Sequence, residues 1–208
     1  MPKVTGIFDV IDNLDELISE DVAKWIKNPP QPIGLQNYIA NRILYPQAIA
    51  ASLGDLEIDL AILREALKKD KSYFSIETRK IIIPDILVSR IPSLAKLVWV
   101  FIDAYLLNLD EKTRPEIWTV VLRSNEVDET LGTIIAPHFK GSGAIEIKLE
   151  DSKQSVIVKQ GGLMIVPCLK SHCKLDFKLS SGEILAQKDG SVEVFGGRLG
   201  LVIEGRIP

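Results

Sequence analysis

The spacing of apolar residues changes near Gly132, and this change constrains the fold more than any other feature of the sequence. Downstream of it, Cys173, Leu175, Phe177 and Leu179 alternate with charged residues, and other runs do the same. Such alternation is typical of strands with one buried face. Turn residues divide the runs, at Gly141, Asp151-Ser152, Gly161-Gly162, Ser181-Gly182, Asp189-Gly190 and Gly196-Gly197. The pattern predicts an all-β module over residues 132–208, a sandwich or barrel of about seven short strands.

Residues 1–131 show mainly the helical period. Residues 12–28 carry an apolar stripe that stops before Pro29-Pro30-Gln31-Pro32, because a residue that precedes proline avoids the helical region. A further helix is expected over residues 34–44, ending before Pro46. The clearest helix follows Asp55, where leucines recur every three or four residues as far as the basic segment 68–71.

A strand, a helix and a second strand are expected between residues 79 and 122. Ile81-Ile82-Ile83 is typical of a buried strand, although Pro84 shortens it. The segment from Pro92 to Leu107 is apolar almost all round, as in a helix buried on every side. Residues 116–122 read as the second strand. The chain is therefore expected to have an α/β part over residues 1–131, with a small parallel sheet, packed on the β-rich module over 132–208.

The composition excludes several classes of protein. The net charge is −3 and the basic residues are scattered among acidic ones, so a nucleic-acid partner is not expected. The most apolar stretch, residues 94–107, is too short and too charged to span a bilayer. The N-terminal residues lack the apolar segment that a signal peptide contains. Two cysteines are too few for a disulfide scaffold. We expect a cytoplasmic protein without a membrane partner.

Four side chains in the β-rich part could act as soft metal ligands: His138, Cys168, His172 and Cys173. Two cysteines and two histidines can bind zinc, and a cysteine beside a histidine can form a nucleophilic pair. The C-x₄-C spacing is loose, however, and no orienting acid is identifiable. Cys173 also fits the inward phase of its strand, where a cysteine serves as a small apolar residue. The expectation is therefore no metal and no catalytic residue.

The glycine pairs do not predict a phosphate site. Gly161-Gly162 and Gly196-Gly197 lie between expected strands and open no helix, and no lysine follows them as in a nucleotide-binding loop. The acidic residues of the first part are spaced as solvated helix faces. No cofactor is expected.

Four segments carry a resemblance to a known family. Residues 35–46 read LQNYIANRILYP, residues 57–67 form an acidic segment that ends in LREAL, residues 131–137 read LGTIIAP, and residues 197–208 read GRLGLVIEGRIP. In this order they resemble the C-terminal third of the glutamate mutase L family. That family comprises actin-like ATPase relatives linked to adenosylcobalamin-dependent mutases. Its corresponding motifs include L-x-N-Y-L-x-N-K-x-x-R-P, L-G-T-V-I-A-P and G-G-x-L-G-L-I-I-D-x-R-G-R-P.

The chain departs from that family where a nucleotide would bind. The resemblance implies that the strand matching residues 80–88 runs into a glycine-rich turn beside the adenosine. Here Ile83 is followed by Pro84-Asp85-Ile86-Leu87, without a glycine. A Cβ at such a turn blocks close approach of the backbone to a ligand. The family's phosphate-binding loops belong to its N-terminal portion, which these residues do not match.

We therefore expect a relative of glutamate mutase L that has lost nucleotide binding and acts as a non-catalytic protein–protein interaction or assembly module. The expected contact surfaces are the β-rich module and the proline elbow of Pro29, Pro30 and Pro32, and a homo-oligomer is compatible with this view. One alternative is an enzyme or small-molecule-binding protein with a cleft between the two parts. Another is a structural module stabilised by zinc.

Overall fold

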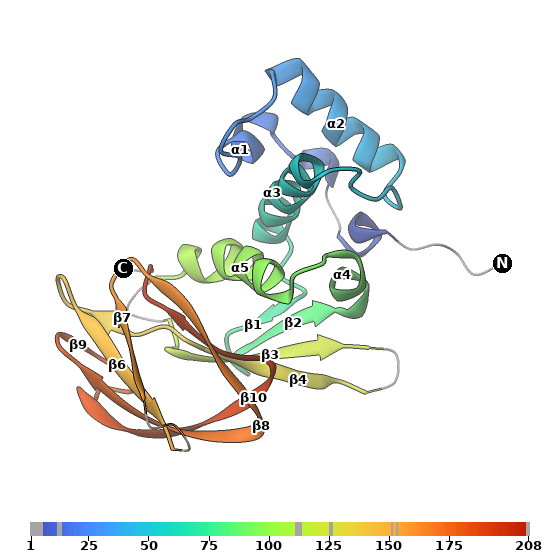
Figure 1. The fold of residues 1–208 in the computed structure, drawn as a ribbon. Coiled ribbons are helices and arrows are strands. Elements are labelled where there is room, and N and C mark those ends of the chain that lie inside the picture. The colour runs from blue at the N-terminus through green and yellow to red at the C-terminus, as the bar shows by residue number, and fades with distance from the viewer. Residues whose placement is uncertain are drawn as a thin grey trace. The chain divides into compact units, whose positions relative to one another are not determined.

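The computed structural model describes residues 6–11, 14–110, 114–124, 127–150, 152 and 154–206. The chain divides into two compact units (Figure 1). The helical unit comprises residues 1–73 and 84–108, and the sheet unit comprises residues 74–83 and 109–208. The chain thus passes between the two units three times, because residues 74–83 leave the helices to join the sheet and residues 84–108 return to the helices.

The helical unit contains five α-helices and three short 3₁₀ helices among the described residues. They are η1 (Ile7–Val10), η2 (Leu14–Glu16), α1 (Ser19–Ala23), α2 (Pro32–Leu44), α3 (Leu53–Lys69), α4 (Asp85–Arg90), α5 (Leu94–Tyr105) and η3 (Leu106–Asn108). The expected stripe over residues 12–28 forms η2 and α1, while residues 12 and 13 lie outside the described part.

The two central helices confirm the sequence predictions. The Ser52 side chain caps α3 by accepting a hydrogen bond from the Asp55 amide at 3.1 Å, and Lys68 and Lys69 lie in its last turn. Ser93 caps α5 by accepting a hydrogen bond from the Lys96 amide at 3.3 Å. Such caps satisfy amides that have no partner within the helix. Most of α5 is buried, as its apolar circumference requires.

In the described part of the sheet unit, an eight-stranded sheet has the order β1-β2-β3-β4-β10-β8-β6-β7, and β5 and β9 form a two-stranded sheet. The strands are β1 (Phe74–Ser75), β2 (Lys80–Pro84), β3 (Ile117–Arg123), β4 (Glu129–Ile135), β5 (His138–Phe139), β6 (Ala144–Leu149), β7 (Ser155–Lys159), β8 (Leu163–Leu179), β9 (Gly182–Glu183) and β10 (Asp189–Glu204). The expected fold class, an α/β part plus a strand-rich C-terminal part, is confirmed.

The strand–helix–strand segment is present, and its strands belong to the large sheet. β2 and β3 are neighbours that point the same way in Figure 1, and the chain between them carries α4 and α5. β3 then pairs antiparallel with β4, and β4 pairs parallel with β10. β4 crosses the position between residues 131 and 132 where the sequence pattern divides the chain. One sheet leaves fewer strand edges unpaired than two separate ones.

β8 and β10 are long bent strands rather than series of short ones. Their antiparallel register shifts between Phe195 and Gly197 and again between Gly197 and Leu201. Gly196-Gly197 therefore lies inside β10 and does not form the expected turn. A bulge and a turn both interrupt the alternation of apolar residues, so the sequence does not distinguish them. Both halves of the two strands contribute to one core cluster, while the sheet remains open at β1 and β7 and does not form a closed barrel.

Candidate functional site

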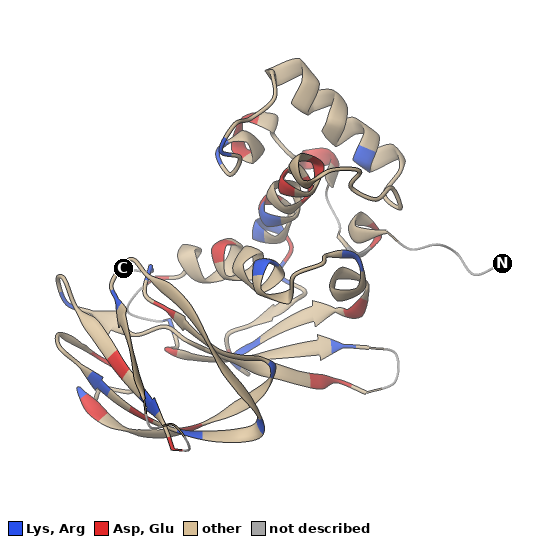
Figure 2. Cartoon of the chain, in the orientation of Figure 1, with Lys and Arg blue, Asp and Glu red and all other residues tan. Residues whose placement is uncertain are grey.

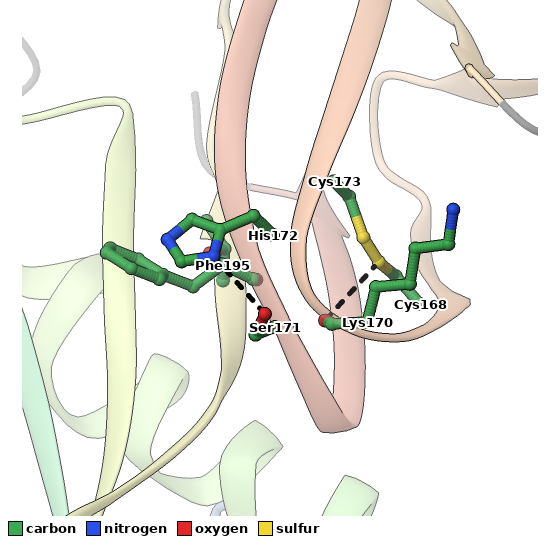
Figure 3. Close-up of a disulfide and its surroundings, with 7 residues drawn as sticks. Cys168, Lys170, Ser171, His172, Cys173 and Phe195 are labelled. Carbon is green, nitrogen blue, oxygen red and sulfur yellow. Dashed lines mark hydrogen bonds between the residues drawn. A yellow bond between two sulfur atoms is a disulfide. The ribbon is translucent and has the colours of Figure 1, made fainter.

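The structure pairs the two cysteines. Cys168 and Cys173 form a disulfide within β8, with their Cα atoms 6.8 Å apart, and each residue is 7% exposed (Figure 3). In a regular strand, residues five positions apart point to opposite faces. Here Leu169, Lys170 and Ser171 bulge out of the pairing with β10, since Cys168 pairs with Gly197 and His172 pairs with Phe195. This bulge brings both sulfurs to the same face. The sequence pattern alone does not reveal it.

His172 lies on the other side of its strand. Its imidazole packs against the Phe195 ring, with 5.0 Å between the ring centroids, and points away from the two sulfurs (Figure 3). Its Nδ1 lies 3.3 Å from the Ser171 hydroxyl. His172 and the cysteines therefore do not form the nucleophilic pair or the zinc ligand set that the sequence raised as alternatives.

His138 belongs to a different environment. It lies on β5, with its Nε2 3.6 Å from a carboxylate oxygen of Glu116. Within the described ranges, no group of three or more histidine, cysteine, aspartate or glutamate residues is placed to hold a metal ion. The four soft ligands are thus divided between a disulfide, an aromatic contact and a contact with the Glu116 carboxylate.

The junction after β2 has the geometry that its proline imposes. Pro84 ends β2 and is the N-cap of α4, with φ −61° and ψ 140°, so the strand passes into the helix without a loop. Ile81 and Ile83 are fully buried. The glycine-rich turn that the family resemblance implies at this position has no equivalent here.

The glycines of the LGTIIAP and GRLGLVIEGRIP segments serve strand pairing. Gly132 on β4 pairs with Gly200 on β10, and a Cβ on Gly132 would lie 2.1 Å from the Gly200 carbonyl oxygen. Their backbones approach closely, which leaves no space for a side chain. Two of the four segments that carry the resemblance therefore meet in parallel strands, and Gly132 and Gly200 have a packing role in this chain.

A long surface segment of the helical unit is almost free of charge. Between residues 28 and 54 the only charged residue is Arg42, whereas 25% of the whole chain is charged. Figure 2 shows α2 in tan apart from one basic residue. Since Arg42 is buried, the exposed face of α2 carries no charge. We call residues 28–54 the uncharged segment; it includes the exposed Pro29, Pro30 and Pro32.

The exposed side chains of the uncharged segment are largely apolar. Large side chains are exposed along and after α2: Ile33 by 70%, Leu44 by 68%, Tyr45 by 57%, Ile49 by 64% and Leu53 by 82%. They begin beside the proline elbow and continue to the first residue of α3. The periodicity of the sequence did not indicate this surface, because a helical period of apolar residues identifies the face that packs inward. The local scarcity of charge is the signal that could have revealed it.

A buried polar cluster fixes α2 on α3. The Arg42 guanidinium donates two hydrogen bonds to Asp59, each 2.7 Å long, and Arg42 and Asp59 are 7% and 1% exposed. The Tyr38 hydroxyl donates to Asp59 at 3.0 Å and accepts from Arg42 at 2.6 Å. Burial raises the pKa of the Tyr38 hydroxyl, and the Asp59 charge acts in the same direction. Leu35 and Ile39 complete the buried face of α2.

Two hollows border the start of α3, and both include Leu53 and Leu56. The first, of about 480 Å³, lies between the segment from Gln47 to Leu53 and residues Ile7, Arg90 and Pro92. The second, of about 450 Å³, is lined by Trp25, Leu60, Trp99, Glu57, Arg64 and Lys96 in addition to the two leucines. Leu53 thus projects between two concave and mainly apolar surfaces of the helical unit.

Comparison with known proteins gives no family model that matches the chain, no similar curated protein and no similar solved structure. None of the helices in the described ranges is both long enough and apolar enough to cross a membrane. The candidate site therefore rests on the geometry of the uncharged segment.

Proposed function

We propose that the chain is a non-catalytic protein–protein interaction or assembly module of the cytoplasm, and that its contact surface is the uncharged segment. The observation that carries the proposal is the exposed face of α2 and of the connection to α3, which is largely apolar and carries no charged side chain. Apolar patches of this kind on a protein surface mark binding sites, and charged residues are depleted at the centres of protein interfaces.

The surface is held rigid, which favours binding. The hydrogen bonds between Arg42 and Asp59 fix α2 to α3, and the prolines restrict the backbone before α2. A preorganised surface loses less conformational entropy when a partner binds. The two hollows beside Leu53 offer pockets for side chains of the partner, and interface energy is concentrated in such pockets.

The resemblance to glutamate mutase L extends this proposal to a larger assembly. By this resemblance, the chain would act by docking onto a larger enzyme complex. The direct passage from Pro84 into α4 supports this view, because no bare glycine backbone is available there to approach an adenosine.

A pair of matched variants tests the proposal. Leu53 and Leu169 are leucines with almost equal exposure, 82% and 83%, on the helical unit and the sheet unit respectively. Tagged wild-type protein, Leu53→Asp and Leu169→Asp are used to capture partners from a native lysate, and the captured proteins are quantified by mass spectrometry. Loss of a specific partner with Leu53→Asp alone is the expected result. Unchanged capture by Leu53→Asp, or loss only with Leu169→Asp, would overturn the assigned surface.

A further inference from the structure

The disulfide joins residues of β8 whose strand pairing does not require the crosslink. On both sides of the bulge, β8 is paired with β10, at Val166 with Leu201 and at His172 with Phe195. The crosslink therefore joins two parts of one strand that are already aligned by their neighbour. It closes a loop of only a few residues, and short loops gain the least stability from a crosslink. Opening the disulfide is compatible with an intact fold.

Both cysteines line one hollow of the sheet unit. Cys168 and Cys173 line a concavity of about 440 Å³ in the sheet unit, together with Leu149, Glu150, Ser152, Val166, Pro167, Leu169, Lys170, His172 and Lys174. Both cysteines are almost buried, so a small molecule in this hollow is better suited to contact them than a protein surface is. Among its described lining residues are two lysines, Lys170 and Lys174, and one carboxylate, Glu150. Positive charge beside a cysteine favours the thiolate and attracts anions.

We propose that Cys168 and Cys173 form a thiol–disulfide exchange site for low-mass thiols that carry carboxylates. A thiolate of the small molecule attacks one protein sulfur, so that the S–S bond breaks, a mixed disulfide forms and the other cysteine leaves as a thiolate. A second small thiolate attacks the small molecule's sulfur in the mixed disulfide and releases the remaining cysteine. Two small thiols are oxidised to one small disulfide, while the protein disulfide takes up two electrons and two protons; the reverse step re-forms it.

The change that follows reduction is local. The bulge packs over Gly196, where a Cβ would lie 2.7 Å from the Cys168 sulfur and 2.1 Å from the Lys170 carbonyl oxygen. When the crosslink opens, residues 169–171 lose their covalent restraint, and Leu169 is free to move with them. The paired parts of β8 and β10 on either side keep their hydrogen bonds. Reduction thus alters the surface of the hollow without unfolding the sheet unit.

The full chain is equilibrated in buffers of reduced and oxidised glutathione, and its thiols are counted by alkylation and mass spectrometry. We expect the ratio of reduced to oxidised protein to follow the square of the reduced glutathione concentration, so that a tenfold rise at constant oxidised glutathione shifts it about a hundredfold. In Cys168→Ser, a mixed disulfide with glutathione should form on Cys173. A protein that stays oxidised in every buffer, or one whose two thiols titrate independently, would overturn the proposal.

Two further readouts separate exchange from a structural role. Hydrogen exchange should increase on reduction at residues 168–173 and remain unchanged in the rest of β8 and β10; a global loss of protection would overturn the proposal. Lys174→Glu should slow the reaction with glutathione several-fold, whereas Lys178→Glu, on the same strand outside the hollow, should not. Equal effects of the two variants would contradict the role of the hollow.

Discussion

Gly132 and Gly200 face each other across two parallel strands with no space for a side chain between them. A Cβ added to Gly132 would lie 2.1 Å from the carbonyl oxygen of Gly200, and the φ angle of Gly132 is +156°. β4 joins β10 at this position, and through this pairing the strands β1 to β4 become part of the same sheet as β8. The continuity of the eight-stranded sheet therefore depends on two glycines.

Gly132→Ala should destabilise the protein by roughly 3 kcal/mol or more, because the obstruction is backbone and cannot rotate away. Gly34→Ala provides the control. Gly34 lies within α2, and its nearest neighbour to an added Cβ is a Pro30 carbon at 3.8 Å. This change should stabilise the protein by up to about 1 kcal/mol. Urea denaturation followed by circular dichroism measures the free energy of unfolding of both variants. Equal values for Gly132→Ala and Gly34→Ala would refute the packing role of Gly132.

Asp59→Ala should lower the free energy of unfolding by roughly 3–5 kcal/mol, because it leaves the Arg42 guanidinium buried without a counter-charge. Replacing both residues, as in Arg42→Met with Asp59→Leu, should recover most of the loss. Asp21→Ala removes an exposed ion pair with Lys24 and should leave the unfolding midpoint unchanged. Thermal unfolding of the wild type and these three variants checks this. A double variant that is no more stable than Asp59→Ala would contradict the coupling.

Stability should fall as pH rises above about 10, the ordinary phenol pKa. Burial raises the pKa of Tyr105, and the Asp70 charge acts in the same direction; burial also raises the pKa of Tyr38. Both hydroxyls keep their protons in the folded protein while the unfolded chain releases them, so the folded state binds more protons above this pH and stability decreases.

This dependence is tested by measuring the melting temperature from about pH 8 to about pH 11.5, on both sides of the ordinary phenol pKa. Tyr105→Phe loses the hydrogen bond that the hydroxyl donates to the Asp70 carbonyl at 2.8 Å, so its stability at neutral pH should drop by about 1 kcal/mol. Above about pH 10, the melting temperature of this variant should fall less steeply with pH than that of the wild type. An unchanged slope would show that Tyr105 does not titrate on unfolding.

Nucleotide should not bind to the chain. Calorimetric titration with ATP and Mg²⁺ is expected to give no heat of binding, because Pro84 joins β2 directly to α4 and leaves no glycine backbone to contact an adenosine. Micromolar affinity would contradict the proposal that the chain has lost the family's nucleotide site. The variant Pro84→Gly, which restores backbone freedom at this turn, serves as a comparison in the same titration.

The sequence allowed the regular elements to be predicted well and the irregular ones poorly. The spacing of Leu56, Leu60, Leu63 and Leu67 predicted α3, and strict alternation predicted the second half of β8. The bends at Gly196 and at residues 169–171 interrupt alternation as turns do, so long strands read as several short ones. Pairing between β4 and β10, far apart in sequence, leaves no local pattern.

The candidate sites were predicted in part. Pro29, Pro30 and Pro32 were expected to be exposed contact residues, and they are exposed, while their role as contacts stays a prediction. The disulfide was not expected, because two cysteines do not make a disulfide scaffold. The bulge that brings both sulfurs to one face of β8 leaves no local pattern in the sequence. The exposed apolar surface of α2 escaped notice because periodicity identifies buried faces and is insensitive to an absence of exposed charge.

The proposed contact surface is tested most directly by site-specific photo-crosslinking in cells of the source organism. A photoreactive amino acid is placed at Leu53 in one protein and at Leu169 in another, two positions of nearly equal exposure on different units. We expect a discrete protein adduct from position 53 and none from position 169. No adduct from position 53, or an equal or stronger one from position 169, would contradict the account.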